Sequence, residues 1–311
     1  MRIVMGVDGS DASLTALDLV TATVWPTDTK IRLVGAFELP ADWIGRAPSP
    51  SDPAADDEAQ RALFNTLQRL SEPIRRQGYA TETVVARGRA ADVLLAEADD
   101  VSADLIVVGS RGLGVAASAL LGSVSATLVD HAVCPVLVAR GPRITRILVA
   151  TDGSQSAEAI PAVVAAWNVF RDAPINVLSV APPSTQGEGT TLMRGMLGSD
   201  PPQLDAWHEV DRHRVMADEM AARLVAAGWH AESSVRVGEA AREIETAAAD
   251  LGADVIITGS RGLGGLQRLL MGSVAHHVLL HSRCSVLVMR GHVPARQQRP
   301  LRPAQTAPSA R

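Results

Sequence analysis

Two glycine-serine segments, each following an apolar run, contain the residues of this chain best suited to binding a phosphate. The first has Gly109-Ser110-Arg111-Gly112, a gap of nine residues, and then Gly122-Ser123. The second repeats the pattern with Gly259-Ser260-Arg261-Gly262 and Gly272-Ser273. Glycines let the backbone approach bulky anionic oxygens and adopt positive φ, and successive N–H groups then form a concave anion site. The pattern therefore predicts a site for a polyphosphate in each half of the chain.

A helix start and an acidic residue accompany each segment. Each Gly-Ser pair runs into a helical stretch, so Ser123-Val124 and Ser273-Val274 would supply free amides, a favourable dipole and a hydroxyl donor. Asp8 and Asp152 close the first apolar run of each half. A carboxylate there could accept ribose hydroxyls or help to hold a divalent cation.

The positions of the basic residues exclude one common type of phosphate site. Lys30 is the only lysine and follows Thr29, which excludes a Gly-Lys-Ser/Thr phosphate loop. Arg111 and Arg261 are candidate phosphate clamps, with solvated loop arginines as the equal alternative. The predicted site is therefore made of backbone amides and a helix N-terminus, with arginine as a candidate addition.

The chain contains the same unit twice. Residues 3–10 reappear as residues 147–154, and residues 103–114 reappear as 253–264 with 9 of 12 positions identical. At roughly 150 residues per domain, 311 residues fit two domains. We expect domain 1 at residues 1–141, domain 2 at 142–290, and a disordered tail at 291–311, which has four Pro, four Arg and no acid.

Short β-branched runs alternate with longer amphipathic stretches in both halves. Such alternation predicts an α/β fold in which each half is a doubly wound parallel sheet flanked by helices. Such sheets bind ligands at the carboxyl ends of their strands. The expected strands are 2–8, 31–37, 81–87, 105–109 and 136–139, and then 146–152, 175–181, 231–237, 255–259 and 286–289.

Composition excludes several classes of protein. Two cysteines cannot build a disulfide-rich scaffold, and a formal net charge of −5 does not suit binding nucleic acid through its phosphates. The apolar runs are far shorter than the roughly 20 residues of a membrane helix, and Asp8 interrupts any signal-peptide core. We expect a reduced, cytoplasmic protein without a nucleic-acid or membrane partner.

These motifs together resemble the ATP-binding branch of the universal stress protein family. The resemblance rests on the Gly-x2-Gly-x9-Gly-Ser spacing, on Asp-Gly-Ser after the first strand, and on Cys-Pro-Val-Leu-Val at residues 134–138. It covers nearly all of residues 1–290, as in a tandem-domain member, and the scarcity of lysine resembles an actinobacterial chain. The resemblance implies a five-stranded parallel sheet of order 3-2-1-4-5 in each domain, with Asp8 facing Gly109.

The resemblance also implies a ligand and the residues that hold it. The ligand is ATP, with or without Mg²⁺. In the first repeat, glycines and Ser123 would cradle the phosphates, Asp8 would act near the ribose or triphosphate, and the backbone around Ala36 would contact adenine. The full first set is Asp8, Ala36, Gly109, Arg111, Gly112, Gly122, Ser123 and Val124. The second set is Asp152, Val180, Gly259, Arg261, Gly262, Gly272, Ser273 and Val274.

Assembly and activity follow from the same resemblance. The last strands of the two domains would pair, and two chains would form a homodimer. The expected role is that of a stress-response regulator whose conformation depends on the nucleotide. A slow ATP hydrolase and an interaction module with vestigial sites are the alternatives, because no general base beyond Asp8 is evident. Tight turns without a ligand and a weak nicotinamide fingerprint at 112–117 are the other interpretations of the glycines.

Three histidines and the two cysteines are interpreted as structural residues rather than as functional ones. Three histidines of the second half have metal-like spacing, but the first half has Ala126, Thr127 and His131 there, and no glutamate lies between them. We therefore expect surface or helix-end histidines and no metal site. The two cysteines are interpreted as buried apolar groups rather than redox groups. The residues concerned are His276, His277, His281, Cys134 and Cys284.

Overall fold

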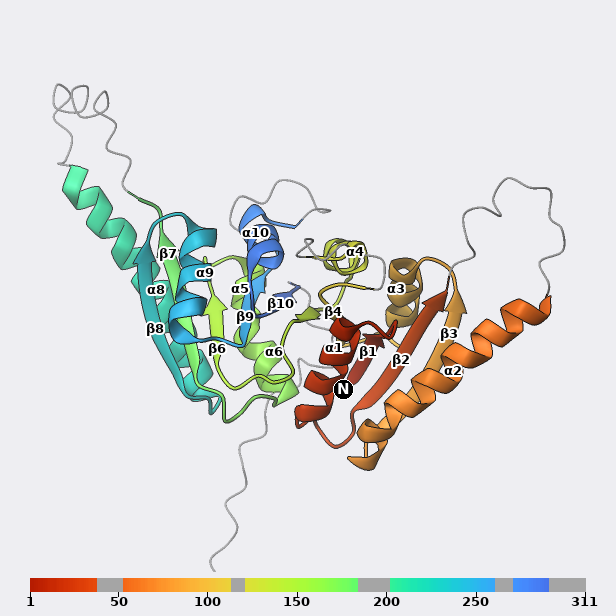
Figure 1. The fold of residues 1–311 in the computed structure, drawn as a ribbon. Coiled ribbons are helices and arrows are strands. Elements are labelled where there is room, and N and C mark those ends of the chain that lie inside the picture. Colours follow the sequence, from red (N-terminus) through yellow and green to blue (C-terminus); the bar gives the residue numbers. More distant parts are fainter. Residues whose placement is uncertain (38–52, 113–120, 184–201, 261–270, 291–311) are drawn as a thin grey trace, which may run out of the picture.

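A computed structural model describes residues 1–37, 53–112, 121–183, 202–260 and 271–290 of the chain (Figure 1). Three sequence-based expectations fall outside these residues: the disordered tail at 291–311, Arg261 and Gly262.

The first repeat contains five strands and four helices among its described residues. Its elements are β1 (Arg2–Gly6), α1 (Asp11–Ala22), β2 (Lys30–Phe37), α2 (Pro53–Arg76), β3 (Ala80–Arg87), α3 (Ala90–Asp100), β4 (Leu105–Gly109), α4 (Ser123–His131) and β5 (Val136–Ala139). Every expected strand is present, but β1 ends at Gly6 instead of Asp8. The chain turns early because Gly9 has φ +81° and the Asp8 carboxylate accepts the Ser10 N–H.

The second repeat has the same order of strands. Its elements are β6 (Ile147–Ala150), α5 (Gln155–Glu158), α6 (Ile160–Trp167), β7 (Ile175–Ala181), α8 (Pro202–Ala226), β8 (Ala231–Val237), α9 (Ala240–Leu251), β9 (Val255–Gly259), α10 (Ser273–His281) and β10 (Ser285–Met289). The helix that α1 forms in one piece is divided into α5 and α6 here, and Pro161 lies at the start of α6. A proline cannot donate the helical hydrogen bond that would continue α5.

All ten strands form one sheet in the order β3-β2-β1-β4-β5-β10-β9-β6-β7-β8. Each half therefore has the expected order 3-2-1-4-5, with parallel pairing within the half. The halves join through β5 and β10, which pair antiparallel with Leu137 opposite Leu287. Neither of these two strands is an exposed edge, because each covers the other.

Helices cover both faces of the sheet, and each face has its own core running through both repeats (Figure 1). Alternating strand residues point to opposite faces: Ile3 and Met5 lie in the core beneath α1 and α2, whereas Val4 lies in the core beneath α3 and α4. The second repeat places α5, α6 and α8 on the first of these faces and α9 and α10 on the other. The two repeats thus share cores across the β5–β10 junction.

Candidate functional site

A cavity of about 550 Å³ lies at the carboxyl ends of β1 and β4 in the first repeat. This is the position at which the strand order reverses, because β1 is hydrogen-bonded to β2 on one side and β4 on the other. All eight residues that the sequence indicated for the first repeat line it: Asp8, Ala36, Gly109, Arg111, Gly112, Gly122, Ser123 and Val124. Segments more than 100 residues apart in the chain therefore meet around one space.

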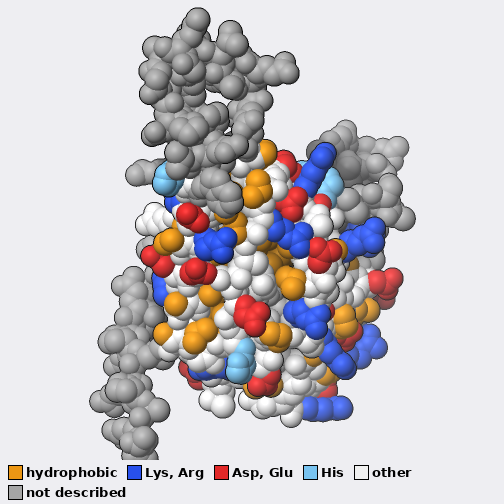
Figure 2. All heavy atoms as spheres, turned by 90° about the vertical axis from the view of Figure 1, so that its left-hand side faces the viewer, with side chains coloured by type: hydrophobic (Ala, Val, Ile, Leu, Met, Phe, Trp, Pro, Cys, Tyr) orange, Lys and Arg blue, Asp and Glu red, His pale blue; other side chains and the backbone are white. Residues whose placement is uncertain are grey.

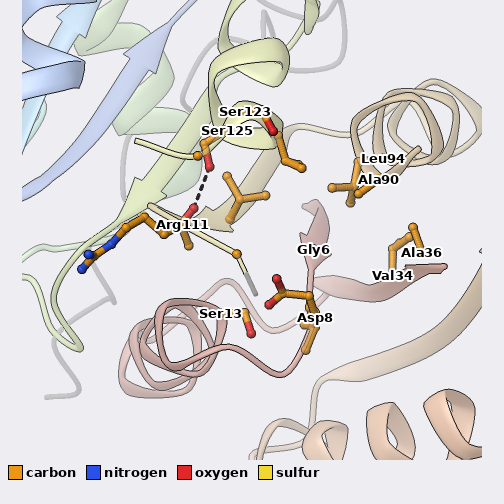
Figure 3. A pocket seen from close by; sticks show the side chains of 16 residues that line it. Gly6, Asp8, Ser13, Val34, Ala36, Ala90, Leu94, Arg111, Ser123 and Ser125 are labelled. Carbon is orange, nitrogen blue, oxygen red and sulfur yellow. Dashed lines mark hydrogen bonds between the residues drawn. The ribbon is translucent and has the colours of Figure 1, made fainter. Parts of the chain in front are cut away.

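Asp8 is held in place at the start of α1. Its Oδ1 accepts hydrogen bonds from the Ser10 backbone N–H at 3.0 Å and from the Ser10 hydroxyl at 2.6 Å. Ser10 in turn caps α1, since its Oγ accepts the Ser13 N–H at 3.2 Å. Figure 3 shows Asp8 and Ser13 on one side of the cavity and Ser123 on the other. The carboxylate is thus held by Ser10, the residue that caps α1.

The glycines of the first segment allow other atoms to pack closely against the backbone, and they do not adopt positive φ. Gly109, Gly112 and Gly122 all lie outside the left-handed region, so the expected positive φ is wrong for them. A Cβ on Gly109 would lie 2.5 Å from the Ala12 carbonyl carbon and oxygen. A Cβ on Gly112 would lie 2.7 Å from Asp8 Oδ2, so Asp8 lies against Gly112, and Gly109 lines the same cavity.

The N-terminus of α4 supplies the amides at the opposite side of the cavity. The Gly122 N–H is already donated to the Ser110 carbonyl at 2.7 Å, so this amide does not face a ligand. Gly122 is the N-cap and has no side chain to satisfy the first-turn N–H groups of Ser123 and Val124. The buried Ser125 hydroxyl donates to the Gly109 carbonyl at 2.7 Å and ties α4 to the end of β4 (Figure 3).

Arg111 lies at the rim of the cavity. Its side chain is exposed, and its guanidinium extends away from Asp8 and Ser123 in Figure 3. Among the described residues that line the cavity, Asp8 and Arg111 are the ionisable ones. The first-repeat arrangement therefore offers hydrogen-bond donors and one carboxylate, and no histidine or second carboxylate within the described lining.

The sequence did not indicate the apolar side of the cavity. Val34, Ala90 and Leu94 line it from β2 and α3, next to Ala36 (Figure 3). Gly6 also lines it, and a Cβ there would lie 2.8 Å from Leu94 Cδ1. Such residues resemble core residues in sequence, because only the fold decides which of them face a cavity. An apolar side of this kind suits an aromatic ring.

The second repeat holds the equivalent residues on equivalent elements. Asp152 follows β6, and its Oδ1 accepts the Ser154 N–H at 3.0 Å. A Cβ on Gly259 would lie 2.5 Å from Ser156 Oγ, as Gly109 approaches α1 in the first repeat. Gly272 is the N-cap of α10 and donates its N–H to the Ser260 carbonyl at 2.8 Å.

The remaining members of the second set occupy the expected elements. Val180 lies in β7, and Ser273 and Val274 begin α10. Arg261 and Gly262 are not among the described residues.

Both halves of the chain match one known protein family. The model of the universal stress protein family matches residues 1–140 and again residues 143–290. The chain belongs to the universal stress protein family. The two matches make it a tandem universal stress protein, as the repeated motifs indicated.

One relative matches nearly the whole chain, and another, shorter relative matches about half of it. The chain is 30% identical over 298 residues to a universal stress protein of Mycobacterium tuberculosis strain H37Rv, covering 93% of this chain and 96% of the relative. It is 32% identical over 139 residues to a universal stress protein of Thermus aquaticus, covering 44% of this chain and 97% of that one.

Solved structures show the same fold. A universal stress protein from Archaeoglobus fulgidus aligns with a TM-score of 0.63 at 19% identity, covering 94% of this chain and 98% of the other. A universal stress protein from Pseudomonas aeruginosa aligns with a TM-score of 0.58 at 19% identity, covering 93% and 92%. At these identities the likeness concerns the fold alone.

The cysteines of the two universal stress domains are free thiols. Burial raises the pKa of the Cys134 thiol to about 12 and that of Cys284 to about 11, so both stay protonated at neutral pH. Cys134 is buried as expected, whereas Cys284 is only partly buried. Among the described helices, none is both long enough and apolar enough to cross a membrane.

Proposed function

We propose that the protein binds ATP, with or without Mg²⁺, at one site in each repeat, and that it acts as a stress-response regulator. The observation that supports this proposal is the cavity in which all eight first-repeat residues meet at the carboxyl ends of β1 and β4. Its volume of about 550 Å³ lies within the range of roughly 300–1,000 Å³ typical of small-molecule sites. The family membership of both halves supports a second site of the same kind.

The two sides of the cavity suit the two ends of a nucleotide. The first-turn amides of Ser123 and Val124, which no side chain caps in the described structure, would hold the phosphates, because a helix N-terminus favours anions. Asp8 would accept ribose hydroxyls or help to hold Mg²⁺. The apolar side around Val34 and Leu94 would contact the adenine ring. Gly112 fits this proposal, because a larger residue would bring a Cβ to within 2.7 Å of the Asp8 carboxylate.

The side chains that line the cavity favour ATP binding without rapid hydrolysis. A hydrolase needs a group that takes a proton from the attacking water. Asp8 is the one candidate among the described lining residues, and its Oδ1 is already held by Ser10. We therefore expect phosphate release below about 1 s⁻¹, the lower end of typical enzyme turnover.

Regulation would act through a surface that changes with nucleotide occupancy and is presented to a protein partner. The segments proposed to change, residues 40–58 and 182–206, lie largely outside the described residues. We further propose that the protein is cytoplasmic and that two chains form a homodimer, with residues 1–141 and 142–290 as its domains.

Substitution of the first residue of α4 tests the nucleotide site with little risk to the fold. Ser123→Pro removes one N–H and one hydroxyl, whereas Ser123→Ala removes only the hydroxyl. Proline is favoured at the first position of a helix, and Gly122 already has the extended φ −80° and ψ 153° that a following proline requires. Gly272 has the same extended conformation, which makes Ser273→Pro the matched change in the second repeat.

Calorimetric titration with ATP should give two sites in the wild type, one weakened site in each proline variant and two weakened sites in the double variant. One lost hydrogen bond to a charged group corresponds to about a 10- to 100-fold weaker Kd. Ser123→Ala should weaken binding less than Ser123→Pro. The proposal fails if the folded wild type shows no ATP affinity, or if the folded double variant binds ATP as tightly as the wild type.

A further inference from the structure

Three potential metal ligands meet on the face of the sheet covered by α9 and α10. Glu245 comes from α9, and His277 and His281 come from α10. Each offers one ligand atom, and these atoms all lie within 4.8 Å of one another. The group lies near the C-terminal end of α10, whereas Ser273 of the proposed nucleotide site begins that helix.

The helical spacing of the two histidines brings their rings together. Residues four apart lie on one face of a helix, and the two rings stack with centroids 4.1 Å apart and an interplanar angle of 28°. Helices α9 and α10 lie side by side in Figure 1 and pack against each other. This packing brings Glu245 to the histidines from a different helix, 32 residues before His277.

The hydrogen bonds leave a lone pair available on His281. Its Nδ1 lies 2.9 Å from the His277 carbonyl oxygen. Because a carbonyl only accepts, this nitrogen carries the proton in that contact, and the neutral ring then has its lone pair on Nε2. Metal-bound histidines commonly use the second ring nitrogen in this way. The backbone of α10 thus prepares His281 to act as a ligand.

Glu245 has a buried carboxylate oxygen that lacks a hydrogen bond. Within the described structure, its Oε1 is inaccessible to solvent and accepts no hydrogen bond. Nε2 of His277 lies 3.6 Å from this oxygen, which is too long for a hydrogen bond. A buried carboxylate oxygen without a donor is costly, and a cation between the carboxylate and the imidazoles would satisfy it.

We propose that Glu245, His277 and His281 form a binding site for a divalent transition metal ion, of which Zn²⁺ fits best. Two imidazoles and one carboxylate are a ligand set that Zn²⁺ accepts, with water in the fourth position. At metal–ligand distances of about 2.0–2.2 Å, tetrahedral ligand atoms lie roughly 3.3–3.6 Å apart. The side chains are partly or fully exposed, so small rotations bring their ligand atoms to this separation.

The first repeat provides an internal comparison. Leu95, Thr127 and His131 occupy the corresponding positions, so only one of the three ligands is present there. Leu95 and His131 instead line a small hollow next to Cys134. The site is therefore a feature of the second repeat alone. Sequence reasoning expected no metal because it looked for a glutamate between the histidines, whereas the fold brings one from α9.

Titration of the tag-free, EDTA-treated full chain with ZnCl₂ tests the proposal. We expect one Zn²⁺ per chain for the wild type, and a Zn²⁺ affinity weaker by about tenfold or more in Glu245→Gln, His277→Ala and His281→Ala, because even outer-shell changes cost about 10–100-fold. His276→Ala is the matched control, since it removes an exposed imidazole from the same helix but from outside the group. Circular dichroism in EDTA checks that each variant is folded.

Cobalt and a gain-of-function variant complete the experiment. Co²⁺ bound to the wild type should give the visible absorption of a tetrahedral site, and the His277→Ala/His281→Ala variant should not. Leu95→Glu with Thr127→His should add a second Zn²⁺ equivalent in the first repeat. Equal Zn²⁺ affinity of the wild type and the double histidine variant would overturn the proposal. A loss of affinity in His276→Ala as large as that in the ligand variants would also overturn it. The group would then be only a Glu245–His277 ion pair.

Discussion

His213 and Ser179 form a partly buried polar contact that replaces an apolar one in the first repeat. His213 Nδ1 lies 2.7 Å from Ser179 Oγ, and this hydroxyl donates to the Thr151 carbonyl at 2.9 Å. The corresponding residues of the first repeat are Gly35 and Leu63, which pack together. Because the Ser179 hydroxyl donates to the Thr151 carbonyl, it is the acceptor in its contact with His213 Nδ1.

This contact makes the stability of the protein depend on pH. Burial lowers the pKa of His213 below its ordinary value of 6.5, and the nearby Glu209 opposes this only in part. A histidine that is neutral in the fold binds a proton more readily after unfolding, so the free energy of unfolding falls as pH decreases below about 6.5. Above that pH, His213 is neutral in both states and contributes no pH dependence.

Replacing His213 should therefore flatten the stability profile in acid. We expect the loss of unfolding free energy between pH 7.5 and pH 5.5 to be smaller in His213→Gln than in the wild type, as measured by urea denaturation at several pH values. His230→Gln is the control, because His230 is exposed. An identical slope in His213→Gln and the wild type would show that His213 does not cause the pH dependence.

At the scale of elements, the end of β4 is packed directly against the first turn of α1. The Gly109 backbone approaches Ala12 so closely that a Cβ would lie 2.5 Å from backbone atoms. Backbone atoms of a capped helix cannot rotate away as a side chain can. This contact sets the position of β4 relative to Asp8, which precedes the same helix. Gly259 also approaches α5, but there the nearest atom to a Cβ would be the Ser156 side-chain Oγ, at 2.5 Å.

Gly109→Ala should destabilise the fold as well as alter the cavity. Overpacking of this kind costs about 1–3 kcal/mol, and we expect a loss of unfolding free energy in that range from urea denaturation. Gly141→Ala is the matched control, since a Cβ there would meet no atom within 4 Å. A Gly109→Ala variant as stable as Gly141→Ala would mean that α1 shifts without cost. Loss of ATP binding in Gly109→Ala alone is therefore poor evidence for a phosphate contact.

At the scale of the whole molecule, two arginines join the repeats across the β5–β10 junction. Arg140 donates to the carbonyls of Leu279 and Cys284, and its backbone N–H donates to Ser285 Oγ at 3.1 Å. Arg290, 150 residues later, donates to the Val129 carbonyl of the first repeat. The Arg140–Leu279 contact in one direction corresponds to the Arg290–Val129 contact in the other. The two repeats are therefore related by approximate twofold symmetry about this junction.

Removing one of these arginines should weaken the junction. Arg140→Ala leaves at least one carbonyl without its donor, and unsatisfied buried groups cost about 1–3 kcal/mol each. We expect a loss of unfolding free energy of that size, measured by urea denaturation. Arg143→Ala, which removes an exposed arginine three residues later, should change stability by less than about 0.5 kcal/mol. Equal effects of the two substitutions would contradict the assigned role of Arg140.

The outermost strands of the described sheet are β3 and β8. Figure 2 shows the side of the molecule on which β8 lies, with positive and negative side chains intermixed. Arg236 of β8 pairs with Asp250 at 2.6 Å, and Glu232 is exposed. Charges on an edge strand oppose further strand pairing. We therefore expect the proposed homodimer to use another surface.

The sequence by itself determined the repeated α/β fold, the places of the ten strands and the family. These features follow from local patterns: β-branched runs, glycine-serine segments and an internal repeat that each half carries separately. It also indicated eight first-repeat residues that line one cavity, because residues at the carboxyl ends of parallel strands share one edge of the sheet.

Only the tertiary structure decided which groups meet across elements. Leu94 and Ala90 look like core residues in sequence, and it is the packing of α3 that makes them line the cavity. Gly109 is a glycine because of α1, which lies about 100 residues earlier. Glu245 joins His277 and His281 because α9 packs on α10. Contacts between segments that are distant in the chain produce no characteristic residue spacing, because the packing of the elements sets their geometry. They therefore cannot be predicted from local sequence patterns.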